Sequence, residues 1–453
     1  MRVARPELPA EIPGAVRAVV DRVVAGGGRA WPVGGTVRDL VRGVAPRDFD
    51  IATDRTPAEL LAVIPDADAA NARLGSVRVD TAVGEVSLTT LRREADYSDH
   101  RRPDTVEFVR DLDTDAARRD FTINALYLDC GAGEIIDPTG GLADLEAGVL
   151  RTIGEPVTRF TEDHLRLLRA VRFAARFDLT IAPATASAIR QTANHLATLA
   201  PERAFSELTA MFTGPGRGRA LRLLVELGIA AVLLPEVAAM DGVTQPPEYH
   251  PEGDVLTHVA LVLDHVPAGD AELAWAAVLH DIGKPPTWRQ AKDRIRFDGH
   301  DALSARMAVD VLQRFRASRR LTDLVADICR DHIRFAALPS MRPRRRERWL
   351  RSPDFERHLA FHRADCLGSH GKLQIHDFAA RELAALPPLS EPLVTGKDVL
   401  ALGIPPGPHV GKILREVEAR ADEATMPPDR SAALVLLREA VERRRQAGEL
   451  PAR

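Results

Sequence analysis

The sequence from Val33 to Thr53 reads VGGTVRDLVRGVAPRDFDIAT, in which a pair of glycines is followed by two closely spaced aspartates. Near its end, Asp48 and Asp50 flank a phenylalanine at the expected start of a buried strand. Alternate strand residues point the same way, so both carboxylates would lie on one face with Cα atoms roughly 6.5 to 7 Å apart. Two such carboxylates suit a pair of Mg²⁺ ions that activate a hydroxyl and hold phosphate oxygens. The pattern therefore predicts metal-dependent chemistry on a phosphate-containing substrate.

Two glycines precede this pair of aspartates. Gly34 and Gly35 let backbone N–H groups approach an anion closely. The helix expected after them directs the positive end of its dipole, and Arg38, toward the same place. A strand, a glycine turn, a helix and a metal-binding strand in this order suit a triphosphate.

Two downstream segments add arginines: RRDFTINAL at 118–126 and EDHLRLLRAVRFAAR at 162–176. On a helix, a residue every three positions forms one stripe, which here comprises Asp163, Arg166, Arg169 and Arg172. Asp163 can accept a hydrogen bond from an amino group while Arg166 donates to a ring nitrogen or carbonyl, so the pair can read the edge of a nucleobase. An exposed row of i,i+3 ion pairs is the alternative interpretation.

The size and patterning of the chain indicate several domains. A chain of 453 residues, 45% hydrophobic and 28% charged, is globular and too long for one core. From Trp31 to about Arg151, short β-prone runs (VRVDTAV, EVSLTTL, TVEFV, EIID) predict a small α/β or α+β domain. From Thr161 onward the pattern is helical, without strong strand candidates. Breaks are expected at 214–218, 245–253 and 386–392.

Composition excludes several classes of protein. An odd number of cysteines without a CxxC pair argues against a disulfide framework and a cysteine-based zinc site, and favours a reducing cytoplasm. These cysteines are Cys130, Cys329 and Cys366. No stretch approaches the ~20 apolar residues that span a bilayer, so no membrane role is expected. A net charge of −4 does not by itself indicate a nucleic-acid binder, and no obligate protein partner is evident.

The order and spacing of these pieces resemble the tRNA nucleotidyltransferase and bacterial poly(A) polymerase family, within the polymerase-β-like nucleotidyltransferases. Five motifs of that family occur in order over about 180 residues, which makes the resemblance highly specific. They are the metal-binding stretch at 33–53, RRDFTINAL, the hinge-like DPTGG at 137–141, the base-reading EDHLR at 162–166 and the neck-like ERAFSEL at 202–208.

The resemblance implies an α+β fold, with a polymerase-β-like nucleotidyltransferase head followed by an all-helical neck, an HD domain and a tail. It also implies addition of CCA to tRNA 3′-ends from CTP and ATP without a nucleic-acid template. In that assignment, Asp48 and Asp50 bind Mg²⁺ and are catalytic. The residues expected to bind the nucleotide are Gly35, Arg38, Arg119, Asp163, Arg166, Arg169 and Arg172, of which Asp163 and Arg166 select the base.

One motif departs from the family. Members carry a third acidic residue in a stretch like EVTTFR, whereas this chain reads SLTTLR and places Ser87 there. Glu85, two positions earlier on the same strand face, is the expected third catalytic carboxylate; alternatively, the third acid is dispensable. The segment RREADYSDHRRP at 92–103 resembles the family's flexible loop, and its full length favours CCA over CC-only addition.

The middle of the chain contains histidines and aspartates on successive predicted helices, which can converge to bind divalent metals. This pattern resembles the HD phosphohydrolase superfamily. The resemblance implies His258, His280, Asp281 and Asp365 as primary ligands of a divalent transition metal, and His300 and His332 as ligands of a second one. Asp331 is an alternative to Asp365. Hydrolysis of 2′,3′-cyclic or 2′-phosphates is the expected activity, and a degenerate domain whose histidines only pack is the alternative.

The expected domains are a catalytic head at 1–150, a helical neck and body at 151–250, an HD domain at 251–372 and a helical tail at 373–453. A Pro/Gly turn that opens a helix at about Val410 could hold an RNA phosphate through backbone amides, and a plain connection between two helices is the alternative. The segment resembles the C-terminal part of HD-containing family members, which implies tRNA binding by the tail. Two alternative functions remain open: a poly(A) polymerase using ATP, and a mainly HD-type phosphohydrolase whose head binds RNA.

Overall fold

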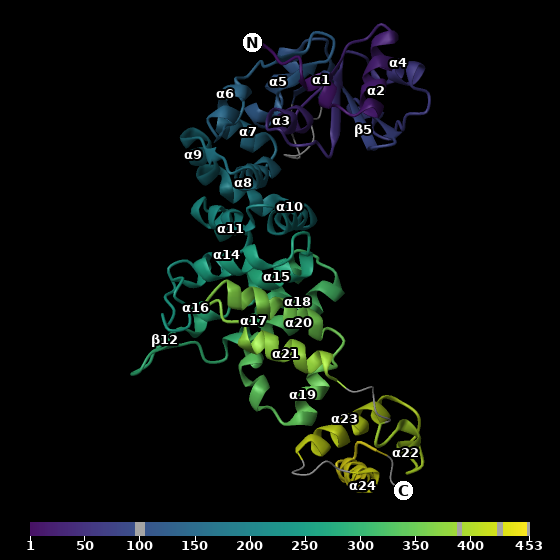
Figure 1. Cartoon of the computed structure of the whole chain (residues 1–453), viewed down its shortest axis with the longest axis vertical. Coiled ribbons are helices and arrows are strands. Elements are labelled where there is room, and N and C mark those ends of the chain that lie inside the picture. Colours follow the sequence, from purple (N-terminus) through teal and green to yellow (C-terminus); the bar gives the residue numbers. More distant parts are fainter. Residues whose placement is uncertain (96–104, 387–391, 424–428, 451–453) are drawn as a thin grey trace. The chain divides into compact units, whose positions relative to one another are not determined.

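The computed structural model in Figure 1 describes residues 1–95, 105–386, 392–423 and 429–450. Most of the loop expected at 92–103 and the centre of the break expected at 386–392 therefore lie outside the described residues. The chain forms two compact units, one of Met1–Arg330 with Leu367–His370 and the other of Asp331–Cys366 with Gly371–Arg453.

The head of the first unit is built on a four-stranded mixed sheet with the order β2-β3-β5-β4. Its strands are β2 (Ala30–Pro32), β3 (Phe49–Thr53), β4 (Ser76–Thr81) and β5 (Gly84–Thr90). β3 runs parallel to β5, and the other neighbours are antiparallel. A three-stranded sheet contains β1 (Arg2–Ala4), β9 (Glu134–Ile136) and β8 (Tyr127–Asp129), and a hairpin pairs β6 (Arg92–Ala95) with β7 (Thr105–Phe108). The four β-prone runs fall on β4, β5, β7 and β9, which confirms them as strands.

Alternation along β3 separates the core from the functional face. Phe49 and Ile51 are buried in a core cluster that also contains residues of β4, β5 and the head helices, whereas Asp50 points to the opposite face. These helices are α2 (Gly14–Ala25), α3 (Gly35–Val41) and α4 (Pro57–Val63). Asp48 lies in the bend immediately before β3, so the prediction that both aspartates lie within the strand is correct only for Asp50.

The turn into α3 requires a glycine. Gly34 has φ +65°, in the left-handed region that side chains other than glycine's rarely adopt, and Gly35 is the first residue of the helix. The chain can therefore turn directly from the end of β2 into the helix that carries Arg38.

The remainder of the first unit is mainly helical, as predicted. Its longer helices are α7 (Pro156–Glu162), α8 (Leu165–Phe177), α9 (Pro183–Thr192), α10 (Pro201–Thr213), α11 (Arg217–Glu226), α14 (Val255–His265), α15 (Ala271–Leu279), α17 (His300–Arg314) and α18 (Arg319–Asp331). α8 contacts α10 and α11, which in turn contact α15 and α14. Two-residue strands that the periodicity did not predict also occur, namely β10 (Val149–Leu150), β11 (Thr180–Ile181), β12 (Arg289–Gln290) and β13 (Ile295–Arg296).

The second unit contains its own buried clusters. One surrounds Phe335, Trp349 and Phe355, and another surrounds Ile413 and Leu437. Its elements are η4 (His332–Ser340), α19 (Pro343–Leu350), α20 (Phe355–Leu367), α21 (Gln374–Ala384), α22 (Gly396–Leu400), α23 (Pro408–Glu423) and α24 (Arg430–Gln446). The helix expected near Val410 thus begins at Pro408. None of the described helices combines the length and hydropathy of a membrane-spanning helix.

Candidate active site

A cleft of about 590 Å³ opens between the head and the first helices after it. Its walls come from the start of α3, the bend before β3, the segment that follows α5 (Leu112–Ala117), and α8. The lining includes both predicted metal-binding aspartates and every predicted nucleotide-binding residue: Gly35, Arg38, Asp48, Asp50, Arg119, Asp163, Arg166, Arg169 and Arg172. Residues separated by more than 130 positions in the sequence thus share one cleft.

The two aspartates at the start of β3 fit a divalent cation. Neither Asp48 nor Asp50 forms an ion pair within the described part of the chain. Burial raises the pKa of Asp50, Asp48 raises it further, and Arg119 opposes the shift. A divalent cation would relieve this repulsion, and carboxylate oxygens are the ligands that Mg²⁺ prefers.

The structure does not bring Glu85 into the cleft. In the β3–β5 pairing it is Ser87 that lies beside Asp50, and the hydroxyl of Ser87 is 3.3 Å from that of Ser76. Glu85 is exposed near the start of β5 and forms an ion pair with Arg78 at 3.4 Å. Glu85 is thus not among the residues that line the cleft, and its role as the third catalytic carboxylate stays a prediction.

Arg38 reaches the cleft from α3 in a fixed position. It donates to Asn124 Oδ1 at 2.6 Å and to Asp39 at 2.9 Å. Its guanidinium carbon lies 4.1 Å from the centre of the Phe177 ring. Burial lowers the pKa of Arg38, while Asp39 opposes the shift. These contacts orient the guanidinium before any ligand arrives.

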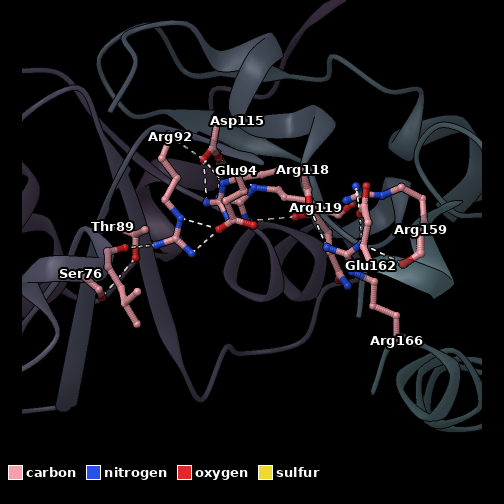
Figure 2. A network of polar contacts seen from close by, with 12 residues as sticks. Ser76, Thr89, Arg92, Glu94, Asp115, Arg118, Arg119, Arg159, Glu162 and Arg166 are labelled. Carbon is pink, nitrogen blue, oxygen red and sulfur yellow. Dashed lines mark hydrogen bonds and ion pairs between the residues drawn. The ribbon is translucent and has the colours of Figure 1, made fainter. Parts of the chain in front are cut away.

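Arg119 belongs to a buried network, which Figure 2 shows together with its neighbours. Arg119 donates to Asp115 at 3.0 Å and to the hydroxyl of Tyr127 at 3.1 Å, and that hydroxyl donates to Asp115 at 2.7 Å. Burial raises the pKa of Asp115, but Arg119 and Arg118 lower it more strongly, to about 2. The carboxylate therefore stays ionised in the folded protein.

The same network extends to β6. Arg118 donates to Asp115 at 2.7 Å and to Glu94 at 3.2 Å, and Glu94 also accepts from Arg92 at 2.6 Å. Asp115 and Glu94 were missed from the sequence. Asp115 lies three residues before Arg118, which is a helical pairing distance, but nothing in the pattern distinguishes Glu94.

Asp163 and Arg166, which are predicted to read the nucleobase, lie where α7 ends and α8 begins. Asp163 precedes α8 and accepts from the backbone N–H of Leu165 at 3.0 Å, and burial raises its pKa. Arg166 donates to Glu162 at 2.7 Å, to the carbonyl of Arg159 at 3.0 Å and to the carbonyl of Arg118 at 3.3 Å. Glu162, Arg159 and Arg166 are seen together in Figure 2.

The other arginines of the stripe have partners on other elements. Arg169 makes two bonds to Asp120, at 2.6 and 2.9 Å, and Arg172 forms an ion pair with Glu207 of α10 at 3.2 Å. Burial raises the pKa of Asp120, but Arg169 and hydrogen bonds lower it to about 2. The interpretation as an exposed i,i+3 row is therefore wrong: these arginines tie α8 to the head and to α10.

A second cluster in the first unit contains imidazoles around one carboxylate. The Nε2 atoms of His280, His300 and His258 lie 3.1, 3.5 and 3.6 Å from the carboxylate oxygens of Asp281. His280 and His300 each place Nδ1 within 2.9 Å of a backbone carbonyl, of Ala277 and Phe297 respectively. Donation from Nδ1 leaves Nε2 able to bind a metal, so this donor set fits a divalent transition metal.

Three further residues complete this cluster and were not predicted. Glu252 lies 2.8 Å from His258 Nδ1 and 2.9 Å from His250 Nδ1. Such a carboxylate–histidine pair fixes the orientation and tautomer of a metal ligand. Lys284 lies 2.7 Å from Asp281, whose pKa burial raises and His280 and Lys284 lower well below its usual value. The sequence around His250 predicts only a break between helices.

The remaining predicted HD ligands belong to the second unit. His332 begins η4, and Asp365 lies in α20. Asp331, the alternative to Asp365, is the last residue of α18. Their roles as ligands stay predictions.

Three features together define a nucleotidyltransferase of the polymerase-β type. They are a helix that begins at a glycine turn, two carboxylates at the start of a central strand of a mixed sheet, and an arginine-lined cleft of nucleotide size. Residues 30–151 match the poly(A) polymerase head domain. Residues 178–240 match a family described as the probable RNA- and SrmB-binding site of polymerase A, and residues 254–367 match the HD domain. The chain belongs to the tRNA nucleotidyltransferase and poly(A) polymerase family, with an HD domain.

Individual relatives support this membership. The CCA-adding enzyme of Lactococcus lactis is 32% identical over 89% of this chain and 91% of its own length. The A-adding tRNA nucleotidyltransferase of Deinococcus radiodurans is 34% identical over 89% and 94%, respectively. The CCA-adding enzyme of Geobacillus stearothermophilus is 41% identical over 48% of this chain and 53% of its own, so the chain spans about half the length of that relative.

The fold also matches a solved structure over its whole length. The crystal structure of the Bacillus stearothermophilus CCA-adding enzyme in complex with CTP superposes with a TM-score of 0.65. The two sequences are 26% identical, and the superposition covers 98% of this chain and 100% of that chain.

Proposed function

We propose that this enzyme adds CCA to the 3′-ends of tRNA from CTP and ATP without a nucleic-acid template. One observation carries the proposal: a single cleft contains the two aspartates suited to Mg²⁺ together with the base-reading pair Asp163 and Arg166. A pocket of directional donors and acceptors rejects a wrong base strongly, because the mismatch leaves buried polar groups unpaired. The protein side chains thus take the place of a template.

The reaction forms a bond between the RNA 3′-oxygen and the α-phosphorus of the nucleotide. The bond from that phosphorus to the bridging oxygen breaks, pyrophosphate leaves with the electron pair, and the hydroxyl proton passes to solvent. Mg²⁺ bound by Asp48 and Asp50 would supply charge stabilisation to the reacting oxygens. Arg38 and Arg119 bind the triphosphate, and because both are already hydrogen-bonded, little ordering is needed on binding.

Selection of the base depends on how firmly Arg166 is oriented. Its guanidinium is fixed by Glu162 and by two backbone carbonyls, so it presents a defined donor geometry. Asp163 supplies the acceptor next to it. Arg169 and Arg172 assist by fixing α8 through their ion pairs with Asp120 and Glu207.

The test uses tRNA transcripts that lack the last three nucleotides. The protein and Mg²⁺ are incubated with CTP and ATP separately and together, and the 3′-ends are sequenced. Addition of CCA followed by a stop supports the proposal. Addition of a single A only to transcripts ending in CC would indicate an A-adding enzyme, and long A tails from ATP alone would indicate the poly(A) polymerase alternative.

We also propose that the cluster around Asp281 binds a divalent transition metal and hydrolyses 2′,3′-cyclic or 2′-phosphates. The three imidazole Nε2 atoms that face one carboxylate favour this second activity. Asp365 and His332 are proposed as further ligands. Metal analysis of protein purified without chelators, followed by assay with 2′,3′-cyclic AMP, tests it. A metal-free protein without hydrolysis would instead indicate the degenerate domain.

We propose the domain boundaries 1–150, 151–250, 251–372 and 373–453 for this function, with tRNA binding by the tail. A cytoplasmic location is proposed because all three cysteines are free thiols, as a reducing compartment maintains. Truncation after residue 386 removes α22, α23 and α24 with their own buried cluster and keeps α21 against η4. It tests the role of the tail: nucleotide addition to a short acceptor RNA should survive, while the KM for full-length tRNA should rise.

A further inference from the structure

A second cleft, of about 530 Å³, adjoins the nucleotide cleft. The two clefts share Asp48, Arg172 and Arg176. The second cleft is not lined by Asp50 or by the base-reading pair Asp163 and Arg166. It therefore reaches the first metal-binding aspartate from a different side than the incoming nucleotide.

The second cleft has a local excess of positive charge. Arg42, Arg47, Arg172 and Arg176 line it, together with Asp39 and Asp48. Asp39 is already paired with Arg38 at 2.9 Å, and Arg172 with Glu207 at 3.2 Å. Arg42, Arg47 and Arg176 form no ion pair within the described part of the chain, and all three are exposed. Uncompensated arginines gathered in a cleft favour an anionic ligand.

Two of these arginines are oriented by an aromatic ring. The guanidinium carbons of Arg42 and Arg176 lie 4.8 and 5.0 Å from the centre of the Phe177 ring. Arginine stacked on an aromatic ring keeps its N–H groups available for phosphate oxygens. The cleft also exposes apolar surface, because two of its lining residues, Val44 (51% exposed) and Pro215, are exposed. Apolar surface and guanidinium planes are what an unstacked nucleobase packs against.

These observations point to a single-stranded nucleotide as the occupant. The volume suits one nucleotide, the arginines suit its phosphates, and the shared Asp48 places it beside the reacting centre. We propose that the second cleft binds the 3′-terminal nucleotide of the acceptor RNA, with Arg42 and Arg47 contacting its phosphodiester and Val44 and Pro215 its base. This assignment rests on the proposed nucleotide-adding function and names the site of its second substrate.

The first experiment separates the two substrates kinetically. Arg42→Ala and Arg47→Ala are compared with wild type and with Arg22→Ala, a partly exposed arginine of α2 that lines neither cleft. The acceptor tRNA is varied at saturating CTP, and CTP is varied at saturating tRNA. Each cleft variant should raise the KM for tRNA about tenfold, as expected for a lost charged hydrogen bond, and leave the KM for CTP within twofold. The Arg22 variant should match wild type.

The second experiment identifies the phosphate. An acceptor whose last phosphodiester is replaced by an uncharged methylphosphonate already lacks the partner of the arginine. The increase in the KM for tRNA caused by Arg47→Ala should fall from about tenfold with the natural acceptor to less than twofold with this acceptor. The slope of log affinity against log salt should also become shallower by about 0.7 for each arginine removed.

The outcomes are distinct. If the cleft variants raise the KM for CTP instead, the arginines serve the incoming nucleotide or the leaving pyrophosphate, and the assignment is overturned. Unchanged kinetics for both substrates, or fully additive losses with the methylphosphonate acceptor, would also overturn it. Wild-type protein that adds no nucleotide to any RNA would overturn the proposed function itself, before the variants are compared.

Discussion

The nucleotide cleft and the histidine cluster arrange their charges in opposite ways. In the cleft, the arginines are fixed by carboxylates such as Asp115 and Asp120, whereas Asp48 and Asp50 form no ion pair within the described residues. In the cluster, the carboxylate of Asp281 is itself surrounded, by Lys284 and three imidazoles. The cleft is thus prepared to receive an anion together with its metal. The cluster is built around one carboxylate and titratable donors, which suits a tightly bound metal.

The largest expected effect tests whether the two sites are independent. Asp50→Asn should reduce nucleotide addition by about 10³-fold or more, because metal stabilisation of the reacting oxygens is worth several kcal/mol. The metal content at the histidine cluster should not change. Asp281→Asn should lower the metal content of the histidine cluster and leave nucleotide addition unchanged. Primer extension and metal analysis on both variants measure this.

A matched loss of both properties in either variant would show that the sites depend on each other. Circular dichroism of each variant distinguishes such coupling from misfolding. Near-normal extension by Asp50→Asn would contradict the assignment of the cleft as the nucleotide-adding site.

The next effect concerns the fixed arginines. Glu162→Gln removes the carboxylate that accepts from both Arg159 and Arg166. Since a hydrogen bond to a charged group contributes about 1.5–3 kcal/mol, kcat/KM for the correct nucleotide should fall about 100-fold. Competition between CTP, ATP and UTP should show increased misincorporation. Glu226→Gln, an exposed residue of α11 paired with Arg190, is the control. Equal losses for right and wrong nucleotides would mean that Glu162 does not act through base selection.

A smaller effect is expected at the outer shell of the histidine cluster. Glu252→Ala should weaken metal binding about tenfold to 100-fold, because it removes the partner of His258 Nδ1. Glu252→Gln should recover part of this loss, since an amide oxygen can accept the same hydrogen bond. Titration with Zn²⁺ or Mn²⁺ followed by calorimetry measures the affinity. Unaltered affinity in the alanine variant would contradict a role for Glu252 in orienting the ligand.

The smallest effect is the acid sensitivity of the buried ion pairs. Asp115 has a pKa of about 2 in the folded protein, below its usual value of 3.8. A carboxyl group with a lowered pKa stabilises the fold above the unfolded pKa, and this contribution disappears as the pH falls from about 3.8 toward 2. The shift corresponds to about 2 kcal/mol.

Asp115→Asn should therefore lower stability at neutral pH and flatten its dependence on pH in that window. Urea unfolding between pH 7 and pH 2.5 provides the measurement. A variant whose stability falls as steeply with acid as that of wild type would place the acid sensitivity elsewhere.

Much of the fold and site followed from the sequence because the signals were local. Short β-prone runs predicted β4, β5, β7 and β9, and helical spacing placed Arg166, Arg169 and Arg172 on one face. The family motifs then predicted that these arginines share one site with Asp48 and Asp50, and all of them line the same cleft. Each of these inferences uses residues that are neighbours in the chain or belong to one motif.

The partners of the arginines could not be predicted in this way. Arg169 pairs with Asp120, which lies 49 positions earlier, and Arg118 pairs with Glu94 across the head. Such pairs depend on how elements pack. The position of Glu85 also depends on packing: it is not among the residues that line the cleft, and its carboxylate pairs with Arg78, so its role as a third catalytic carboxylate stays a prediction.

The carbonyl oxygen of Arg118 accepts from both Arg159 and Arg166. Because this acceptor is a main-chain atom, it would be present whatever side chain occupied position 118. Replacement of Arg118 would remove ion pairs to Asp115 and Glu94 but leave the main-chain acceptor of Arg166 in place. The orientation of Arg166 therefore does not depend on the side chain at position 118. Substitutions there should reduce the stability of the protein and not its fidelity.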